Sequence, residues 1–111
     1  LLADVSAHAL RAAMADPGKA GTYHVAAGGE TTWHAYARYV VGKAQQSGEI
    51  FKCGPQQVLP VPSSHFAAAA HRPDNSRLDT ARFRATFGLS LPPWEQGVAR
   101  LLEELLPPPA P

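Results

Sequence analysis

The chain has 111 residues, which is the size of one domain, and 45% of them are hydrophobic, enough for a modest core. Its formal net charge is +1, from 10 Lys and Arg against 9 Asp and Glu, so it lacks the basic excess of a nucleic-acid-binding protein. One cysteine, Cys53, excludes an internal disulfide and is typical of a cytoplasmic protein. No apolar run approaches the roughly 18–20 residues needed to span a membrane.

The first predicted element is an amphipathic helix. Apolar residues recur at helical spacing from Leu2 to Ala13, and Pro17 with Gly18 stops the pattern. Asp4 interrupts the apolar stretch and no basic region precedes it, so these residues do not resemble a signal peptide. The sequence lacks an initiator methionine and opens inside this helix, and we therefore expect a piece of a longer protein.

A short strand is expected next, at about residues 22–27, followed by a second helix. The segment TYHVAA has strand character and is bounded by glycines. Thr31 or Thr32 can then cap a helix. The predicted apolar stripe of that helix consists of Trp33, Ala37, Val40, Val41 and Ala44.

The second half predicts one more strand and further helices. The strand is expected at about residues 57–61, held out of a helix by Pro60. Asp79 is a good N-cap for a short helix that ends near Gly88. A last, leucine-rich helix follows the proline-rich connector. The Pro-rich residues 107–111 are expected to be a disordered tail.

Together these elements predict an α/β fold with two short strands and four to five helices. The strands are separated by a helix and could lie parallel. Two strands form a marginal sheet, so they need packed helices or a larger sheet elsewhere. We expect residues 1–106 to form one lobe.

The sequence YVVGK contains Tyr-x-x-x-Lys, the spacing of the catalytic pair in short-chain dehydrogenases. On a helix, Tyr39 and Lys43 lie on one face, and a nearby ammonium would favour tyrosinate. The chemistry also needs a glycine-rich cofactor turn, but Gly28 and Gly29 have no third glycine at the required spacing. We therefore interpret the pair as a tyrosine ring packed on a lysine stem.

The densest polar stretch, RPDNSRLDT, is the candidate binding site. Arg72 and Arg77 offer planar donors suited to phosphate or carboxylate, and Asn75 and Ser76 add hydrogen-bonding groups. The alternative is a turn that bonds to itself and caps the next helix through Asp79. The five histidines and Cys53 do not follow zinc-site spacing, so no metal site is predicted.

Several segments in order resemble a known family. These are GTYHVAAGGETTWHAYARYVV, VLPVPSSHF, and HRPDNSRLDTARFRATFGLSLPPWEQGVARLLEEL. From Leu1 to about Leu106 the chain is similar to the C-terminal third of the dTDP-4-dehydrorhamnose reductase family, which are extended short-chain dehydrogenases. The resemblance implies the C-terminal substrate-binding lobe of a Rossmann-type reductase that reduces dTDP-4-dehydro-L-rhamnose to dTDP-L-rhamnose, in the supply of rhamnose for bacterial surface polysaccharides.

The resemblance also implies what this chain lacks and what it holds. The catalytic Tyr and Lys and the NADPH or NADH site lie upstream in the family, so no catalytic or cofactor-binding residue carries over and none is expected here. The loop from Arg72 to Thr80 belongs to the lobe that faces the dTDP-sugar. Some members use Mg²⁺ and form homodimers, and Glu104 falls where a metal-ligand glutamate could lie.

Three alternatives remain open. One is a related nucleotide-sugar epimerase or dehydratase. Another is a non-catalytic relative of the regulatory subunit of methionine adenosyltransferase. The third is a free-standing interaction domain. The residues upstream of Leu1 would discriminate among them, because the catalytic groups of each enzyme lie there.

Overall fold

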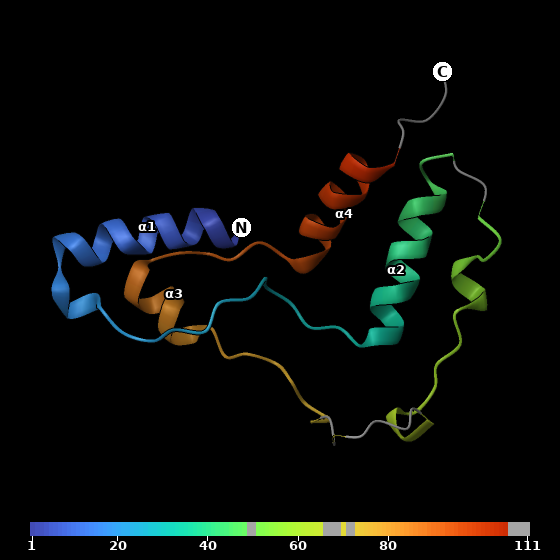
Figure 1. The fold of residues 1–111 in the computed structure, drawn as a ribbon, viewed down its shortest axis with the longest axis horizontal. Helices are drawn as coiled ribbons and strands as arrows, with labels where there is room; N and C mark the ends of the chain where they lie inside the picture. Colours follow the sequence, from blue (N-terminus) through green and yellow to red (C-terminus); the bar gives the residue numbers. More distant parts are fainter. Residues whose placement is uncertain (49–50, 66–69, 71–72, 107–111) are drawn as a thin grey trace. The chain divides into compact units, whose positions relative to one another are not determined.

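The computed structural model describes residues 1–48, 51–65, 70 and 73–106 (Figure 1). The described part contains four α-helices and three short 3-10 helices. The α-helices are α1 (Leu2–Ala15), α2 (Trp33–Gln45), α3 (Ala81–Phe87) and α4 (Trp94–Leu105). The 3-10 helices are η1 (Pro17–Lys19), η2 (Pro55–Gln57) and η3 (Ser63–His65). None of the helices in the described residues has the length and apolar character that crossing a membrane requires.

The chain folds into two compact units, each of them built from two separate segments. Unit 1 consists of Leu1–Gly29 and Ser76–Trp94, and it contains α1, η1 and α3. Unit 2 consists of Glu30–Asn75 and Glu95–Pro111, and it contains α2, η2, η3 and nearly all of α4. The core and the site of each unit are therefore described separately.

Three aromatic rings form the core of unit 1. Tyr23 contacts Phe83 and Phe87 of α3 edge-on, with ring centroids 6.0 and 5.1 Å apart. Phe83 is only 3% exposed. The Tyr23 hydroxyl donates a hydrogen bond to the Lys19 carbonyl (2.6 Å), and the Arg82 guanidinium lies 4.9 Å from the Tyr23 ring centroid. Both contacts hold the Tyr23 ring between η1 and α3. The core of unit 1 therefore forms only when segments about 60 residues apart in the sequence come together.

Helix α3 begins and ends as its sequence predicts. The Asp79 carboxylate accepts a hydrogen bond from the Ala81 backbone N–H (2.8 Å), although Thr80 occupies the N-cap position itself. At the other end, Gly88 has a φ of 65°, in the left-handed region where residues with a side chain are strained. The Gly88 N–H donates to the Arg84 carbonyl and closes the last turn (2.9 Å).

The predicted α/β fold is wrong, because neither expected strand forms in the described residues. Residues 22–27 have no regular secondary structure. Of residues 57–61, the first ends η2 and the others have no regular secondary structure. A strand requires a neighbouring segment that pairs with its backbone hydrogen-bonding groups, and no described residues form such a ladder with these two segments. Pro60, with no N–H, further weakens the second segment as a strand.

Unit 1 contains an isolated parallel bridge, outside both of the predicted strands. It joins Gly28 to Pro93. The Gly28 N–H donates to the Pro92 carbonyl (2.8 Å), and the Gly28 carbonyl accepts from the Trp94 N–H (3.0 Å). A side chain at position 28 would place its Cβ 3.0 Å from the Leu91 carbonyl oxygen. Glycine at this position therefore allows the two segments of unit 1 to approach each other.

In unit 2, helix α2 has the predicted cap, and its predicted apolar stripe is buried or half-buried except at Trp33. The Thr32 hydroxyl accepts a hydrogen bond from the Ala35 N–H (3.1 Å). Ala44 is buried as the apolar stripe predicts, whereas Trp33, placed in the same stripe, is 85% exposed. The His34 ring hydrogen-bonds the Val58 carbonyl (2.9 Å between Nε2 and O), which ties α2 to the segment after η2.

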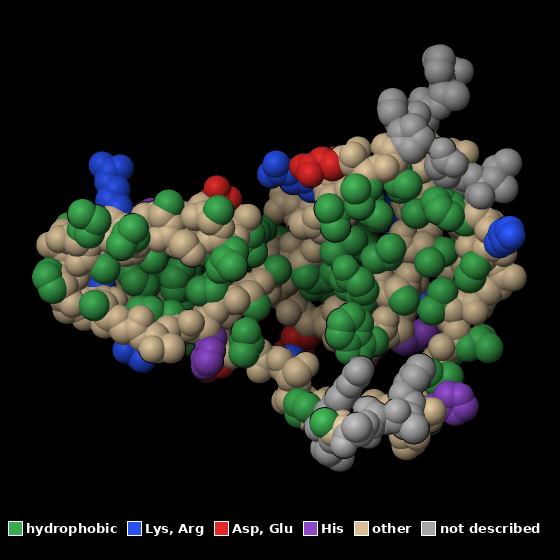
Figure 2. All heavy atoms as spheres, in the orientation of Figure 1, with side chains coloured by type: hydrophobic (Ala, Val, Ile, Leu, Met, Phe, Trp, Pro, Cys, Tyr) green, Lys and Arg blue, Asp and Glu red, His purple; other side chains and the backbone are tan. Residues whose placement is uncertain are grey.

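Few apolar side chains are fully buried in the described residues. Val5, Ala44 and Phe83 are the buried ones. Figure 2 shows hydrophobic side chains over much of the visible face. The large exposed ones include Leu2, Leu10 and Met14 of α1, Trp33 of α2, and Leu101 and Leu105 of α4.

Candidate functional site

Three of the four predicted site residues, Asn75, Ser76 and Arg77, lie in the described part of the chain. Arg72 lies outside the described residues. Asn75, Ser76 and Arg77 are exposed and belong to no helix. The boundary between the units falls within this stretch, since Asn75 ends the first segment of unit 2 and Ser76 opens the second segment of unit 1. Their role in binding therefore stays a prediction.

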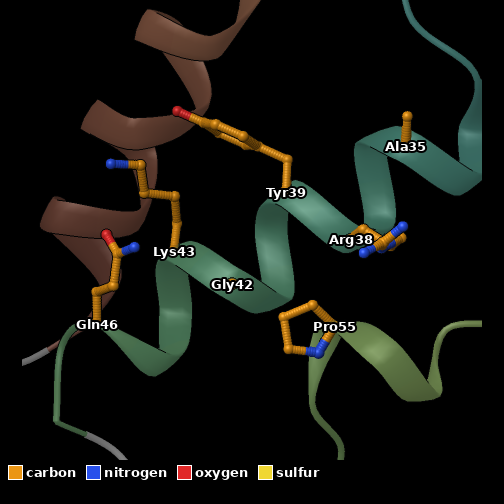
Figure 3. Close-up of a pocket in the computed structure, with 7 residues that line it drawn as sticks. All are labelled: Ala35, Arg38, Tyr39, Gly42, Lys43, Gln46 and Pro55. Carbon is orange, nitrogen blue, oxygen red and sulfur yellow. The ribbon is translucent and has the colours of Figure 1, made fainter.

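The structure does show a hollow on helix α2 in unit 2 (Figure 3). It has a volume of about 440 Å³ and is broadly open to solvent. Its lining residues are Ala35, Arg38, Tyr39, Gly42, Lys43, Gln46 and Pro55. Gly42 helps to shape it, because a Cβ there would lie 3.4 Å from the Pro55 side chain of η2. This contact was not predicted from the sequence, in which Gly42 inside the expected helix and Pro55 are separate features.

Tyr39 and Lys43 both line this hollow, but their contacts are those of packing. The Tyr39 hydroxyl donates a hydrogen bond to the Glu95 backbone carbonyl at the start of α4 (3.2 Å). The Lys43 ammonium lies 6.0 Å from the centroid of the Tyr39 ring, at the limit of a cation–π contact. In Figure 3 both side chains extend to the same side of α2, toward α4. The tyrosine therefore joins two helices of unit 2.

The hollow carries positive charge but little enclosure. Arg38, Lys43 and Gln46 are exposed, and the residues that line the hollow include no carboxylate. Such a surface attracts an anion, but the attraction between solvated charges is weak and is screened by salt. The hollow can therefore contribute to the field around an anionic ligand, and it does not enclose a reacting group.

Among the described residues, the glycine pair is engaged in packing and no cluster of metal-ligating side chains is present. The glycine pair that could have formed a phosphate-binding turn, Gly28 and Gly29, is held by the bridge to residues 92–94 and by contact with the Trp94 ring. No group of three metal-ligating side chains lies together in the described part. Glu104, expected at a metal-ligand position, forms an ion pair with Arg100 (3.0 Å).

The two tryptophans of the chain have opposite surroundings. Trp94 is partly buried, and its ring lies against Gly29, where an added Cβ would be 3.2 Å away. Trp33 opens α2 and is the most exposed large apolar side chain in the described residues. Its ring meets the Tyr36 ring edge-on, with centroids 6.1 Å apart and an interplanar angle of 80°. Helical periodicity assigned Trp33 to the core and so missed it as a surface feature.

Comparison with known proteins gives a consistent result. The family model described as RmlD substrate binding domain matches residues 1–106. The dTDP-4-dehydrorhamnose reductase of Salmonella typhimurium (strain LT2) is 47% identical over 105 residues, which cover 95% of this chain and 34% of the relative. The Escherichia coli protein of the same name is 46% identical over the same shares. That of Burkholderia thailandensis is 31% identical over 109 residues, covering 95% and 37%. The chain thus spans about a third of the length of these curated relatives.

Proposed function

Because the chain belongs to the family of RmlD substrate binding domains, we propose that it is the substrate-binding part of a dTDP-4-dehydrorhamnose reductase. The observation that carries this proposal is the match over residues 1–106, together with 47% identity to a relative of that name. The identity extends over 95% of this chain, so it includes both compact units.

The proposed reaction is the reduction of dTDP-4-dehydro-L-rhamnose to dTDP-L-rhamnose. NADPH or NADH, when bound, would supply the hydride for the 4-keto carbon, and a proton donor would supply the proton for its oxygen. Both the dinucleotide and the proton donor are assigned to the rest of the protein. Two contacts support this division: the Tyr39 hydroxyl is bonded to the Glu95 carbonyl, and Gly28 is bonded to residues 92 and 94.

Within this division, the chain contributes recognition of the sugar nucleotide. Arg72, Asn75, Ser76 and Arg77 are the proposed contacts. Guanidinium groups suit the diphosphate, because their planar donors pair with two oxygens at once. The exposure of Ser76 and Arg77 leaves them accessible to a ligand. Arg38 and Lys43 add positive charge in unit 2.

The test uses the full-length protein and the isolated chain side by side. Full-length protein mixed with NADPH and dTDP-4-dehydro-L-rhamnose should consume NADPH, while the chain alone should not. Tyr39→Phe in the full-length protein should leave kcat unchanged, because its hydroxyl serves α4. Turnover by the isolated chain that Tyr39→Phe abolishes would contradict the proposal.

A matched pair of arginine variants tests the recognition loop. Arg77→Ala should raise KM for the sugar nucleotide roughly 10- to 150-fold, since a charge-assisted hydrogen bond contributes roughly 1.5–3 kcal/mol. Arg84→Ala on α3 removes the same charge from another exposed position and should leave KM unchanged. Equal effects of the two variants would show that only the overall charge matters.

The proposal also includes the cytoplasm as the location and a homodimer as the assembly. The exposed free thiol of Cys53 is in keeping with a reducing compartment. Gel filtration of the full-length protein at several concentrations measures the assembly directly. A magnesium requirement would be tested by activity after chelation; the bond between Glu104 and Arg100 gives it no support from the described residues.

A further inference from the structure

Trp33 is a large aromatic side chain that is not buried in the described structure. Trp33 is 85% exposed at the first residue of α2. Tryptophan is highly buried on average, because leaving its large apolar surface in water is unfavourable. The other tryptophan of this chain, Trp94, follows that rule by packing on Gly29. The exposed surface of Trp33 is therefore available to something that each unit by itself does not supply.

The position of Trp33 is fixed although its surface is open. The Thr32 side chain caps the same helix turn, so the backbone at position 33 is anchored. The Tyr36 ring stands at 80° to the indole and restricts its rotation. His34, the next residue, is tied to the Val58 carbonyl. An anchored ring loses little conformational entropy when a ligand stacks on it.

The sequence around Trp33 favours a small planar ligand over a protein surface. The residues before it, Glu30, Thr31 and Thr32, are exposed and polar, so the aromatic surface at this end of α2 is confined to the indole and the Tyr36 ring beside it. Broad apolar patches are typical of protein interfaces. A small aromatic surface next to polar groups is typical of a platform for a nucleobase, because every base has an apolar face and polar edges.

Resting on the proposed function, we propose that Trp33 is the stacking platform for the thymine base of the dTDP-sugar. The indole face covers the base, and the polar groups before it leave the base edges hydrated or hydrogen-bonded. The residue positions the nucleotide and does not touch the reacting carbonyl. Its loss should therefore raise KM for the sugar nucleotide and leave kcat unchanged.

Kinetics of the full-length protein provide the first test. Trp33→Leu keeps an apolar side chain but removes the aromatic face, and should raise KM by roughly 5- to 150-fold, as expected from the loss of one stacked base. Trp33→Phe should recover most of the affinity. Leu101→Ala, at an exposed apolar position on α4, is the matched control and should leave KM within twofold. KM for NADPH should not change in any variant.

Fluorine NMR decides the case if Trp33→Leu does not fold. The full-length protein is labelled with 5-fluorotryptophan, and the Trp33 resonance is the one lost in Trp33→Phe. Addition of dTDP should shift this resonance, while inorganic phosphate should not. The inference is overturned if dTDP leaves the Trp33 resonance unshifted, or if a folded Trp33→Leu protein has an unchanged KM. Either result would assign the ring to contact with the rest of the protein. Wild-type protein without reductase activity overturns the proposed function instead, and a dTDP shift would still support the platform.

Discussion

Two glycine-to-alanine substitutions should change stability in opposite directions, because the added methyl group meets different surroundings. At Gly28 the new Cβ would lie 3.0 Å from the Leu91 carbonyl oxygen, closer than nearly all real contacts of this kind. The oxygen cannot retreat freely, since the neighbouring Pro92 carbonyl accepts the Gly28 N–H at 2.8 Å. Crowding of this kind costs about 1–3 kcal/mol.

At Gly97 the same methyl group would meet nothing within 4 Å. Gly97 lies inside α4, where alanine is favoured over glycine by roughly 0.8–1 kcal/mol because it restricts the unfolded chain more. Gly28→Ala should therefore lower the free energy of unfolding by about 1–3 kcal/mol. Gly97→Ala should raise it by up to about 1 kcal/mol.

Urea denaturation followed by circular dichroism measures both variants under the same conditions. The midpoint should move down for Gly28→Ala and up for Gly97→Ala, with equal slopes. Gly42→Ala is an intermediate case, because a helix gain competes with a 3.4 Å approach to Pro55. A Gly28→Ala protein as stable as the wild type would refute the reasoning, because it would mean that residues 28 and 91–94 are not held as described.

Further substitutions test individual contacts. Thr32→Ala should destabilise α2 by about 1 kcal/mol through loss of the cap, and Thr32→Ser should restore it; helix content and melting temperature report both. Tyr39→Phe should cost about 0.5–1.5 kcal/mol in urea denaturation by removing the bond to Glu95, and a neutral result would mean that water replaces it. Phe83→Ala should cost about 3–5 kcal/mol, because Phe83 is 3% exposed; a loss below 1 kcal/mol would contradict the aromatic core of unit 1.

The helices could be predicted from the sequence because their signals are local. Thr32 bonds a backbone N–H three residues away, and Gly88 closes α3 through its own φ. Such contacts depend on a few neighbouring residues and hold in any tertiary context. The same reasoning predicted Asp79 as the N-cap of α3. Thr80 occupies that position, and Asp79, one residue before it, accepts the hydrogen bond from the Ala81 N–H.

The strands could not be predicted, because strand character alone does not supply a partner. Residues 22–27 have the composition of a strand, but a ladder depends on a second segment far away in the sequence. The described residues of unit 1 form an isolated bridge between Gly28 and Pro93 instead of a ladder. The exposure of Trp33 was missed for a related reason: periodicity shows which face is apolar, and it does not show whether that face has a partner.

The candidate site was partly accessible from the sequence. The chemistry of Arg77 and Ser76 suggests a polar ligand, but the division of the chain into two compact units beside them could not be predicted from the residues alone. The hollow on α2 also escaped prediction, since it depends on η2 approaching Gly42. The interpretation of Tyr39 and Lys43 as packing residues stays a prediction. In the structure the Tyr39 hydroxyl bonds the Glu95 carbonyl, and the Lys43 ammonium lies 6.0 Å from the centroid of the Tyr39 ring.

The assembly of unit 1 from two distant segments affects how the protein folds during synthesis. Thr22 and Arg82, which bond across the aromatic core, are 60 residues apart. At the usual speed of translation, roughly 3–12 s pass between the synthesis of Tyr23 and that of Phe83. During this interval α1 and Tyr23 are exposed to the cell without their core partner, while most of unit 2 is already made. Unit 1 is thus begun first and completed at Trp94, after the first segment of unit 2 has been made and before its second segment, which begins at Glu95.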